Sequence, residues 1–301
     1  MGCLTDSDYL YVVLPYFNYC EFVSRRKLFI ECVERLMKTP GIRVVVSEAL
    51  GPSPLPKMNV DYHYKVPIKD QIWIKEVLVN MVVPRLPKDW KYLAWIDADI
   101  TFLNRNWVKE TKDLLSDNEV LQLFQTAVNL GPTGESFKID KSFGYMYKDS
   151  GTSYVKNDKY GFWHPGYAWA CSRKAWKKMG GLIDWAILGS ADRHMAMAMI
   201  KMAEASCPGN IHQNYKLLLK RYEARCTGLR LSYVHGTILH HWHGSLANRK
   251  YRERWTILTT NSFDPFEDLD TDSQGLTIFT SKGQRLKKEI LEYFLERKED
   301  E

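Results

Sequence analysis

The sequence lacks the cysteine spacing of a structural zinc site, although it contains six cysteines. None of them forms a C-x-x-C pair, and most lie in apolar surroundings that are typical of reduced core thiols. No apolar run is long enough to span a bilayer, and the first residues have neither the basic nor the apolar part of a secretory signal. These absences predict a soluble, cytoplasmic protein in a reducing compartment.

Two further absences narrow the class of protein. There is no glycine-rich loop of the P-loop kind, which argues against an NTPase. There is no internal repeat or low-complexity linker, so we expect one catalytic domain over residues 8–260, with a loop and helix over 261–301 packed on it. What is present is ordinary for a globular protein, with 45% apolar and 26% charged residues. The net charge of +6 suits an anionic substrate such as a nucleotide.

Apolar segments of strand and helix period alternate along the first hundred residues. This order predicts an α/β protein with an open sheet flanked by helices. A polar segment over residues 129–159 has little periodicity and predicts a functional loop or lid. We expect strands at 10–15, 42–47, 62–66, 92–100, 120–127, 161–171 and 231–239, and helices at 25–38, 70–83, 107–115, 173–179, 192–205, 212–226, 249–259 and 285–299.

The apolar strand that begins at Tyr92 ends in two acids, Asp97 and Asp99. The end of a strand is where an open α/β sheet places its ligands. Buried carboxylates are costly unless they are paired or bind a metal, and two carboxylates in this position suit Mn²⁺ or Mg²⁺. The alternative is a simple turn, because aspartate is common after strands.

Two later segments carry further candidate residues. The first has a glycine pair, Gly180-Gly181, followed by Asp192 at the expected start of a helix. The second is His240-His241-Trp242-His243-Gly244 at the end of a strand. On a strand, His241 and His243 would point to the same side. We favour His243 as a metal ligand because the following glycine allows a close backbone approach, but His240 and His241 remain open as alternatives.

In this order the three segments resemble those of nucleotide-sugar glycosyltransferases of the GT-A fold. Residues 180–192 are similar to the corresponding segment of β-1,4-galactosyltransferases and polypeptide GalNAc-transferases. The resemblance extends over roughly 10–243 as an order of motifs and is close only within them. It implies a GT-A (Rossmann-like) open mixed sheet. It also implies a metal-dependent enzyme that transfers a sugar from a nucleoside diphosphate donor, with UDP as the first expectation.

The resemblance also assigns roles to the acids and histidines. Asp99 is the first metal ligand, Asp97 binds the metal or the donor ribose, and a histidine such as His243 completes the Mn²⁺ or Mg²⁺ site. Asp192 stands where inverting relatives carry the general base that takes a proton from the acceptor hydroxyl. The chain departs from the usual Glu-Asp pair here, because residue 191 is alanine, and a helix N-cap is the alternative role for Asp192.

Residues near these motifs are candidates for substrate contacts. Those for the donor follow the first strand, lie on the helix before the acids or belong to the basic stretch after the histidines. They are Tyr16, Asn18, Trp73, Asn80, Asp97, Arg249 and Lys250. The basic side chains would approach the diphosphate, with a solvated helix face as the alternative. Candidates for the acceptor side are Trp163, His164, Tyr167 and Trp185, whose rings suit a sugar or a base.

The expected acceptor is a saccharide hydroxyl. Without a signal or anchor, a bacterial or viral enzyme is the natural setting, in the second case in the host cytoplasm. There a hydroxymethylated base in DNA is an alternative acceptor, with the basic helix 212–226 following the phosphates. A metal-dependent phosphohydrolase and a non-catalytic nucleotide-sugar binding module are less favoured alternatives. The sequence leaves open the transferred sugar, the stereochemistry and the oligomeric state.

Overall fold

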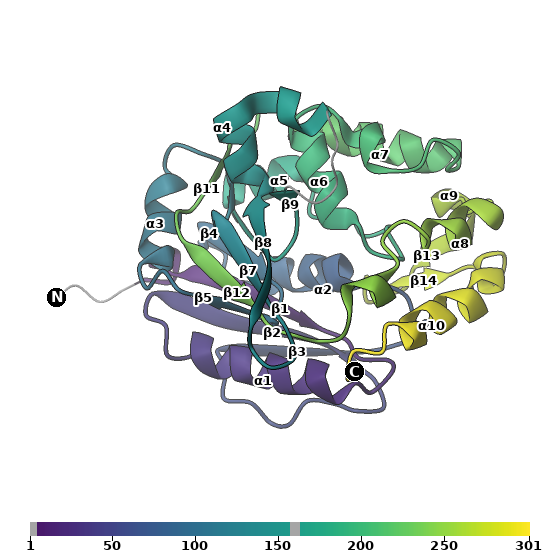
Figure 1. Ribbon diagram of the computed structural model, residues 1–301, viewed down its shortest axis with the longest axis horizontal. Helices are drawn as coiled ribbons and strands as arrows, with labels where there is room; N and C mark the ends of the chain where they lie inside the picture. The colour runs from purple at the N-terminus through teal and green to yellow at the C-terminus, as the bar shows by residue number, and fades with distance from the viewer. Residues whose placement is uncertain (1–4, 157–162) are drawn as a thin grey trace.

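The computed structural model describes residues 5–156 and 163–301, and for 152–156 it describes the backbone only. A seven-stranded mixed sheet forms its centre, in the order β11-β6-β10-β4-β1-β2-β3 (Figure 1). Strand β1 is parallel to β2 and β4, whereas β10 is antiparallel to β4 and β6. The strands are β1 (Leu10–Tyr16), β2 (Ile42–Leu50), β3 (Tyr62–Pro67), β4 (Tyr92–Ile96), β6 (Val120–Gln122), β10 (Ala168–Ser172) and β11 (Leu231–Tyr233).

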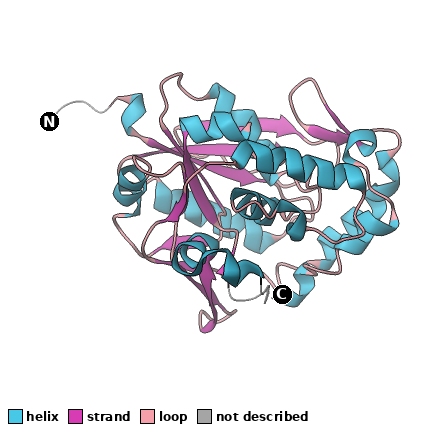
Figure 2. Ribbon diagram, turned by 90° about the horizontal axis from the view of Figure 1, so that it is seen from above, coloured by secondary structure: helices cyan, strands magenta, loops and turns pink. Residues whose placement is uncertain are grey.

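Strand β1 lies inside the sheet between β4 and β2, and its apolar side chains are buried on both faces. Leu10, Val12 and Leu14 pack with the apolar side of α1 (Val23–Leu36), whereas Tyr11 and Val13 pack with α2 (Lys75–Val82) on the other face. Successive side chains of a strand point to opposite faces, so one strand supplies both hydrophobic layers. Figure 2 shows the twisted strands between their helices.

A second sheet of five strands begins where β4 ends. Its order is β5-β12-β7-β8-β9, with β5 (Ile100–Phe102) following β4 after only three residues. Strand β12 (Thr237–His240) pairs with β5, and His240 lies opposite Ile100. The chain therefore passes from the large sheet to the small one through Asp97, Ala98 and Asp99. The remaining strands are β7 (Thr126–Leu130), β8 (Ser136–Ser142) and β9 (Trp163–His164).

The other elements cover the sheets or form a separate group at one side of the molecule. Figure 1 shows α8, α9, α10 and the β13–β14 hairpin together in that group. No helix within the described ranges has the length and apolar character needed to cross a bilayer. The elements are α3 (Trp107–Leu114), α4 (Phe143–Lys156), α5 (Arg173–Met179), α6 (Ala191–Met199), α7 (Gln213–Cys226), α8 (Trp255–Thr260), α9 (Pro265–Asp268), α10 (Lys287–Glu296), β13 (Leu269–Thr271) and β14 (Thr277–Phe279).

The predicted mixed α/β architecture is confirmed, and several predicted elements are corrected. The segment predicted as a loop or lid contains β8 and α4 instead; residues 157–159 of it lie outside the described part. The prediction failed because β8 reverses the usual pattern of a strand: it buries the polar Asp140 and Ser142 and exposes the apolar Phe137 and Ile139. The strands predicted at 120–127 and 231–239 each divide into two strands of different sheets, β6 with β7 and β11 with β12.

Candidate active site

The acidic pair lies at the joint between the two sheets. The backbone N–H of Asp97 donates to the carbonyl of Tyr167 at 2.7 Å, and the carbonyl of Asp99 accepts from the N–H of His241 at 2.8 Å. Both backbone positions are therefore fixed by neighbouring strands and loops. The side chains retain 27% and 20% exposure, so the carboxylates are accessible from the adjoining cavities.

Asp99 forms a compact cluster with two buried histidines, His240 and His243. Their potential ligand atoms lie within 4.8 Å of one another. The Oδ2 atom of Asp99 is 2.8 Å from Nε2 of His243 and 3.7 Å from Nε2 of His240. The two Nε2 atoms are 3.3 Å apart. A carboxylate and two imidazoles at these separations form a candidate cation site.

The hydrogen bonds around the histidines direct lone pairs into this cluster. Nδ1 of His240 lies 2.9 Å from Oδ1 of Asn129, which can only accept, so this ring carries its proton on Nδ1. Burial lowers the pKa of His240 to about 4, which keeps the ring neutral at pH 7. Nε2 of His243 accepts from the guanidinium of Arg249 at 2.7 Å. Nε2 of His240 therefore presents its lone pair toward Asp99, whereas the single lone pair of Nε2 of His243 accepts from Arg249 until a cation displaces that guanidinium.

Acceptor atoms that face one another in a buried place repel unless a positive charge joins them. In addition, Oδ1 of Asp99 is buried without a hydrogen-bond partner among the described residues. This orphaned oxygen and the two lone pairs fit a divalent cation. Two imidazoles in the set argue against Mg²⁺, which prefers oxygen ligands.

A buried lysine joins two of the predicted acids on the other side of Asp99. The Lys75 ammonium lies 2.6 Å from Oδ2 of Asp192 and 3.1 Å from Oδ1 of Asp97. Burial would lower the pKa of Lys75, but Asp192 and Asp97 together raise it well above its usual value. Burial raises the pKa of Asp97 to about 6 in spite of the lysine. The pair of acids thus shares one permanent positive charge.

Asp192 lies in the first turn of α6, and Ser190 occupies the N-cap position with a positive φ of 78°. The alternative role of Asp192 as the helix N-cap is therefore wrong. Arg254 donates to the hydroxyl of Ser190 at 2.5 Å, which fixes the loop in front of the helix. Asp192 instead directs its carboxylate into the site, where Lys75 holds it.

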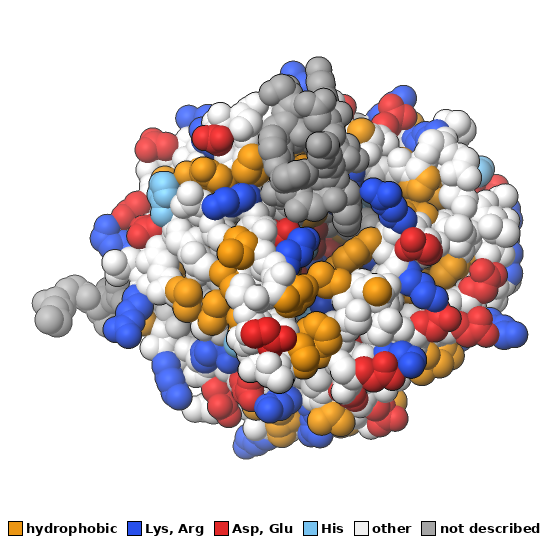
Figure 3. Space-filling view, viewed as in Figure 1, with side chains coloured by type: hydrophobic (Ala, Val, Ile, Leu, Met, Phe, Trp, Pro, Cys, Tyr) orange, Lys and Arg blue, Asp and Glu red, His pale blue; other side chains and the backbone are white. Residues whose placement is uncertain are grey.

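Two cavities that are open to solvent meet at the acidic pair. The first is bounded by residues of β1 and α1, among them Tyr16 and Arg25, and the second by His164, Tyr167 and Asp192. On the face seen in Figure 3, basic and hydrophobic side chains surround a central hollow. The residues common to both linings are Trp73, Lys75, Asp97, Asp99, Arg249 and Arg297.

The structure brings four of the predicted donor contacts to the first cavity, namely Tyr16, Trp73, Asp97 and Arg249. The other three are not in its lining, because their side chains are used elsewhere. Asn18 is buried and bonds to the backbone of Phe22, and Asn80 bonds to both backbone groups of Leu182. Lys250 pairs with Glu296 at 2.7 Å on the surface.

Two of the four predicted acceptor-side residues line the second cavity. His164 and Tyr167 stack there with ring centroids 3.8 Å apart. Trp163 instead packs edge-on against Phe143. Trp185 is partly buried, packs against Tyr215 at the edge of the hydrophobic core and is absent from both linings.

The predicted orientation of the three histidines is wrong. Strand β12 ends at His240, so the alternation of a strand no longer applies to the residues that follow. His240 and His243 approach Asp99 together, whereas Nε2 of His241 lies 2.8 Å from the hydroxyl of Thr101. The glycine at 244 does have a special conformation, but its close neighbour is the backbone of residues 297–299, not a ligand.

Sequence reasoning assigned no role in the site to four charged side chains, Lys75, Arg254, Arg297 and Glu299. The position of Lys75 could have indicated its role, because it directly follows the apolar run of residues 72–74. A lysine buried at such a position needs an acidic partner. The other three lie in highly charged stretches whose composition resembles a solvated surface. Only the fold shows that Arg297 and Glu299 are buried.

Among known proteins, no family model matches the chain, and no curated protein sequence matches it. The solved structures similar to it include a mutant of Drosophila β1,4-galactosyltransferase 7 with manganese, UDP-Gal and xylobiose (14% identity, 90% of this chain and 93% of that chain, TM-score 0.44). Another is the mannosyltransferase PcManGT of Pyrobaculum calidifontis with GDP-Man and Mn²⁺ (13%, 84% and 61%, TM-score 0.42). A third is a glycosyltransferase involved in glycosylation of the major capsid of PBCV-1 (11%, 80% and 96%, TM-score 0.32). Because these TM-scores are below 0.5, we argue function from the site residues instead.

Proposed function

We propose that the protein is a metal-dependent glycosyltransferase that moves a sugar from a nucleoside diphosphate, with UDP as the first candidate, to a saccharide hydroxyl. The observation that carries the proposal is the cluster of Asp99, His240 and His243 at the meeting point of two cavities. An enzyme of this kind needs a cation beside the donor phosphates and a separate place for the acceptor. The arrangement supports both needs.

At the edge of the first cavity, Asp99 and His243 would hold Mn²⁺ together with His240, which lines the second cavity. Bound there, the ion would supply Lewis-acid stabilisation of the negative charge on the departing diphosphate. The guanidinium groups of Arg249 and Arg297 line the same cavity and suit phosphate oxygens. Asp97 is held by Lys75 outside the metal cluster, which favours its alternative role toward the donor ribose over direct metal binding.

In the second cavity, Asp192 would take the proton of the acceptor hydroxyl as that oxygen attacks the sugar. A general base must stand within hydrogen-bond reach of the reacting hydroxyl. Lys75 fixes the carboxylate of Asp192 through Oδ2, on the side nearest Asp97 and hence the donor. The stacked rings of His164 and Tyr167 offer an apolar wall for a sugar ring.

The contacts of the basic side chains on helix α7 favour a saccharide acceptor over modified DNA. Lys216 donates to the carbonyl of Gly209, and Lys220 pairs with Glu204. Arg221 lies over the ring of Phe266. The acidic partner of Lys220 interrupts the positive charge along this helix, and local contacts hold the other two side chains, which argues against a continuous phosphate-binding stripe for a DNA duplex.

The proposal is tested by thermal unfolding with Mn²⁺ and a panel of UDP- and GDP-sugars. A ligand at 100 times its Kd stabilises the folded state by about 2.7 kcal/mol. We expect one nucleotide sugar to raise Tm only when Mn²⁺ is present, and Asp99→Asn to abolish the rise. Asp113→Asn is the matched control, because Asp113 pairs with Lys109 on an exposed helix face. The absence of any nucleotide-dependent shift, with or without metal, would remove the transferase proposal.

A further inference from the structure

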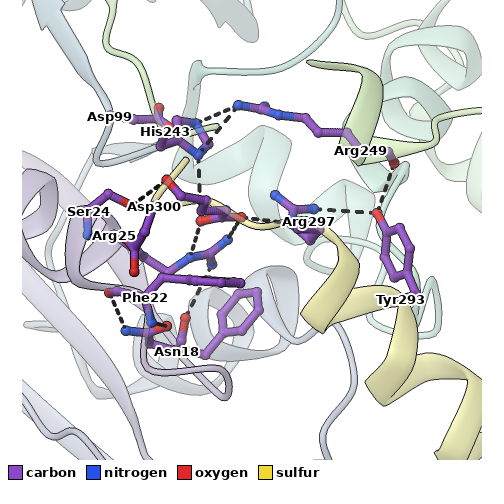
Figure 4. A network of polar contacts seen from close by, with 12 residues as sticks. Asn18, Phe22, Ser24, Arg25, Asp99, His243, Arg249, Tyr293, Arg297 and Asp300 are labelled. Carbon is purple, nitrogen blue, oxygen red and sulfur yellow. Dashed lines mark hydrogen bonds and ion pairs between the residues drawn. The ribbon is translucent and has the colours of Figure 1, made fainter. Parts of the chain in front are cut away.

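The last residues of the chain pack against the start of α1 and against the candidate cation site of Asp99, His240 and His243. We call residues 297–300 the closing segment. The carboxylate of Asp300 accepts from the backbone N–H groups of Val23 and Ser24 at 3.0 and 2.7 Å. The Ser24 hydroxyl donates to the carbonyl of Glu299 at 2.8 Å. Figure 4 shows Ser24 next to Asp300. Since α1 has no side-chain cap of its own, Asp300 supplies the negative group that its first turn needs.

Within the closing segment, Glu299 is held between two arginines. Arg25 binds both carboxylate oxygens, at 2.8 and 2.6 Å, and Nε of Arg297 binds one of them at 2.7 Å. The side chain of Glu299 is only 2% exposed. A carboxylate bonded to two guanidinium groups is held as an ion pair, so Glu299 is a fixed, buried negative charge.

This charge faces the outer nitrogen of His243. Oε2 of Glu299 lies 3.6 Å from Nδ1 of His243. A carboxylate beside Nδ1 favours the tautomer with its proton on that nitrogen, which leaves Nε2 as an acceptor. The Arg249 nitrogen that lies 2.7 Å from Nε2 is 3.4 Å from Nδ1, and the shorter contact favours the same tautomer, with Nε2 unprotonated. His243 is thus oriented from both sides, with Arg249 at Nε2 and Glu299 at Nδ1.

The backbone next to His243 packs closely against the backbone of the closing segment. Gly244 has a φ of +85°, and a Cβ there would lie 2.8 Å from the carbonyl oxygen of Lys298 and 2.9 Å from Cα of Glu299. Only glycine allows this approach without strain. The loop that carries His243 and the segment that carries Glu299 are therefore packed backbone against backbone, and neither can shift without the other.

We infer that Glu299, clamped by Arg25 and Arg297, is a positioning residue that holds His243 with Nε2 directed at Asp99 and so strengthens divalent-cation binding. The inference rests on the proposed metal-dependent function. Carboxylates that orient metal-binding histidines in this way contribute about 10–100-fold to metal affinity. Glu299 acts through His243, and because it also borders the first cavity, the test of this role is made without nucleotide.

The test is Mn²⁺ affinity, measured by the EPR signal of free Mn²⁺ at pH 7 without nucleotide. Glu299→Gln keeps the size of the side chain and removes its charge, and we expect the Kd for Mn²⁺ to rise by about tenfold or more. Glu296→Gln is the matched control, because Glu296 pairs with Lys250 on the surface just before the closing segment. Its Kd should stay within about twofold of the wild type, since exposed pairs contribute little. A lower Tm with unchanged Mn²⁺ affinity in Glu299→Gln would show a purely structural role and overturn the inference.

A second measurement uses wild-type protein and so does not depend on whether the Glu299→Gln variant folds. In wild-type protein labelled with ¹⁵N-histidine, the ring shifts distinguish a proton on Nδ1 from one on Nε2, and His243→Asn identifies the signal. We expect the Nδ1–H tautomer, and the Nε2–H tautomer would overturn the inference. Wild-type protein that binds no Mn²⁺ would end this inference and the metal-dependent function together. If the wild type binds Mn²⁺ and Glu299→Gln binds it with the same affinity, only this inference would be contradicted.

Discussion

The replacement Lys75→Met removes the one cation that Asp97 and Asp192 share while it nearly preserves the volume of the side chain. The lysine side chain is 9% exposed, so the methionine thioether fits the same buried path. Removing one partner of a buried ion pair costs about 3–5 kcal/mol, because the other charge remains buried. Here the two acids retain 27% and 20% exposure, and water relieves part of that penalty. We therefore expect Lys75→Met to lower the free energy of unfolding by an amount near the lower end of this range, about 3 kcal/mol at pH 8.

The loss of stability in Lys75→Met should increase as pH rises. Burial raises the pKa of Asp97 to about 6 in the presence of Lys75, and the lysine is a lowering influence. Without it, the folded-state pKa of Asp97 rises further above the unfolded value of about 3.9. A folded state that binds its proton more tightly gains stability at low pH and loses it as pH rises. The variant should therefore lose less at pH 5 than at pH 8.

Urea unfolding followed by tryptophan fluorescence at both pH values measures this effect. Lys75→Met/Asp192→Asn should recover part of the loss, because it removes one of the uncompensated acids. Lys109→Met is the control, since Lys109 and Asp113 are exposed and such pairs contribute about 0–1 kcal/mol. A Lys75→Met protein within about 1 kcal/mol of the wild type at pH 8, or an equal loss at both pH values, would refute the reasoning.

Three further predictions concern neighbouring groups. Burial raises the pKa of Glu76 to about 8, above its unfolded value, so wild-type stability should fall as pH rises from about 4.5 to 8, and Glu76→Gln should flatten this slope in urea unfolding. Asp192→Asn should lower kcat of sugar transfer by about 10²–10⁴-fold while the Kd for Mn²⁺ stays unchanged, and full activity would exclude the role of general base. Gly244→Ala should lower the free energy of unfolding by more than about 1 kcal/mol and weaken Mn²⁺ binding, because its Cβ would meet the carbonyl of Lys298 at 2.8 Å. An alanine variant with wild-type Tm would contradict the close backbone packing.

The acidic pair could be located from the sequence because its signal is local. An apolar run that ends in Asp97 and Asp99 indicates a buried strand with carboxylates at its end, and the structure has both. The alternation of strands and helices likewise predicts a mixed sheet, because each apolar period reports which face is buried. Even so, the strand ends four residues earlier than predicted, since Ile100 already belongs to the second sheet.

The partners of the acids could not be predicted, because they depend on contacts between distant segments. Lys75 meets Asp192 across a separation of 117 residues. Glu299 meets Arg25 across 274. In the sequence, a charged residue in a charged stretch looks the same whether it is solvated or buried against a partner. The orientation of His240 and His243 failed for a related reason, since it depends on where β12 ends, and no residue type marks that point.

The contact between the closing segment and α1 also has a consequence for the order of assembly. The carboxylate of Asp300 reaches the N–H of Val23 across 277 residues. Contacts of such separation form late in folding, because the chain between them must first be organised. The central sheet can therefore be complete while His243 still lacks its buried carboxylate neighbour. A molecule in that state would keep its core and its amide protection in β1, yet bind cations poorly. Hydrogen exchange at the amides of Val23 and Ser24 should then report each opening of the closing segment, and thus the fraction of molecules with a finished site.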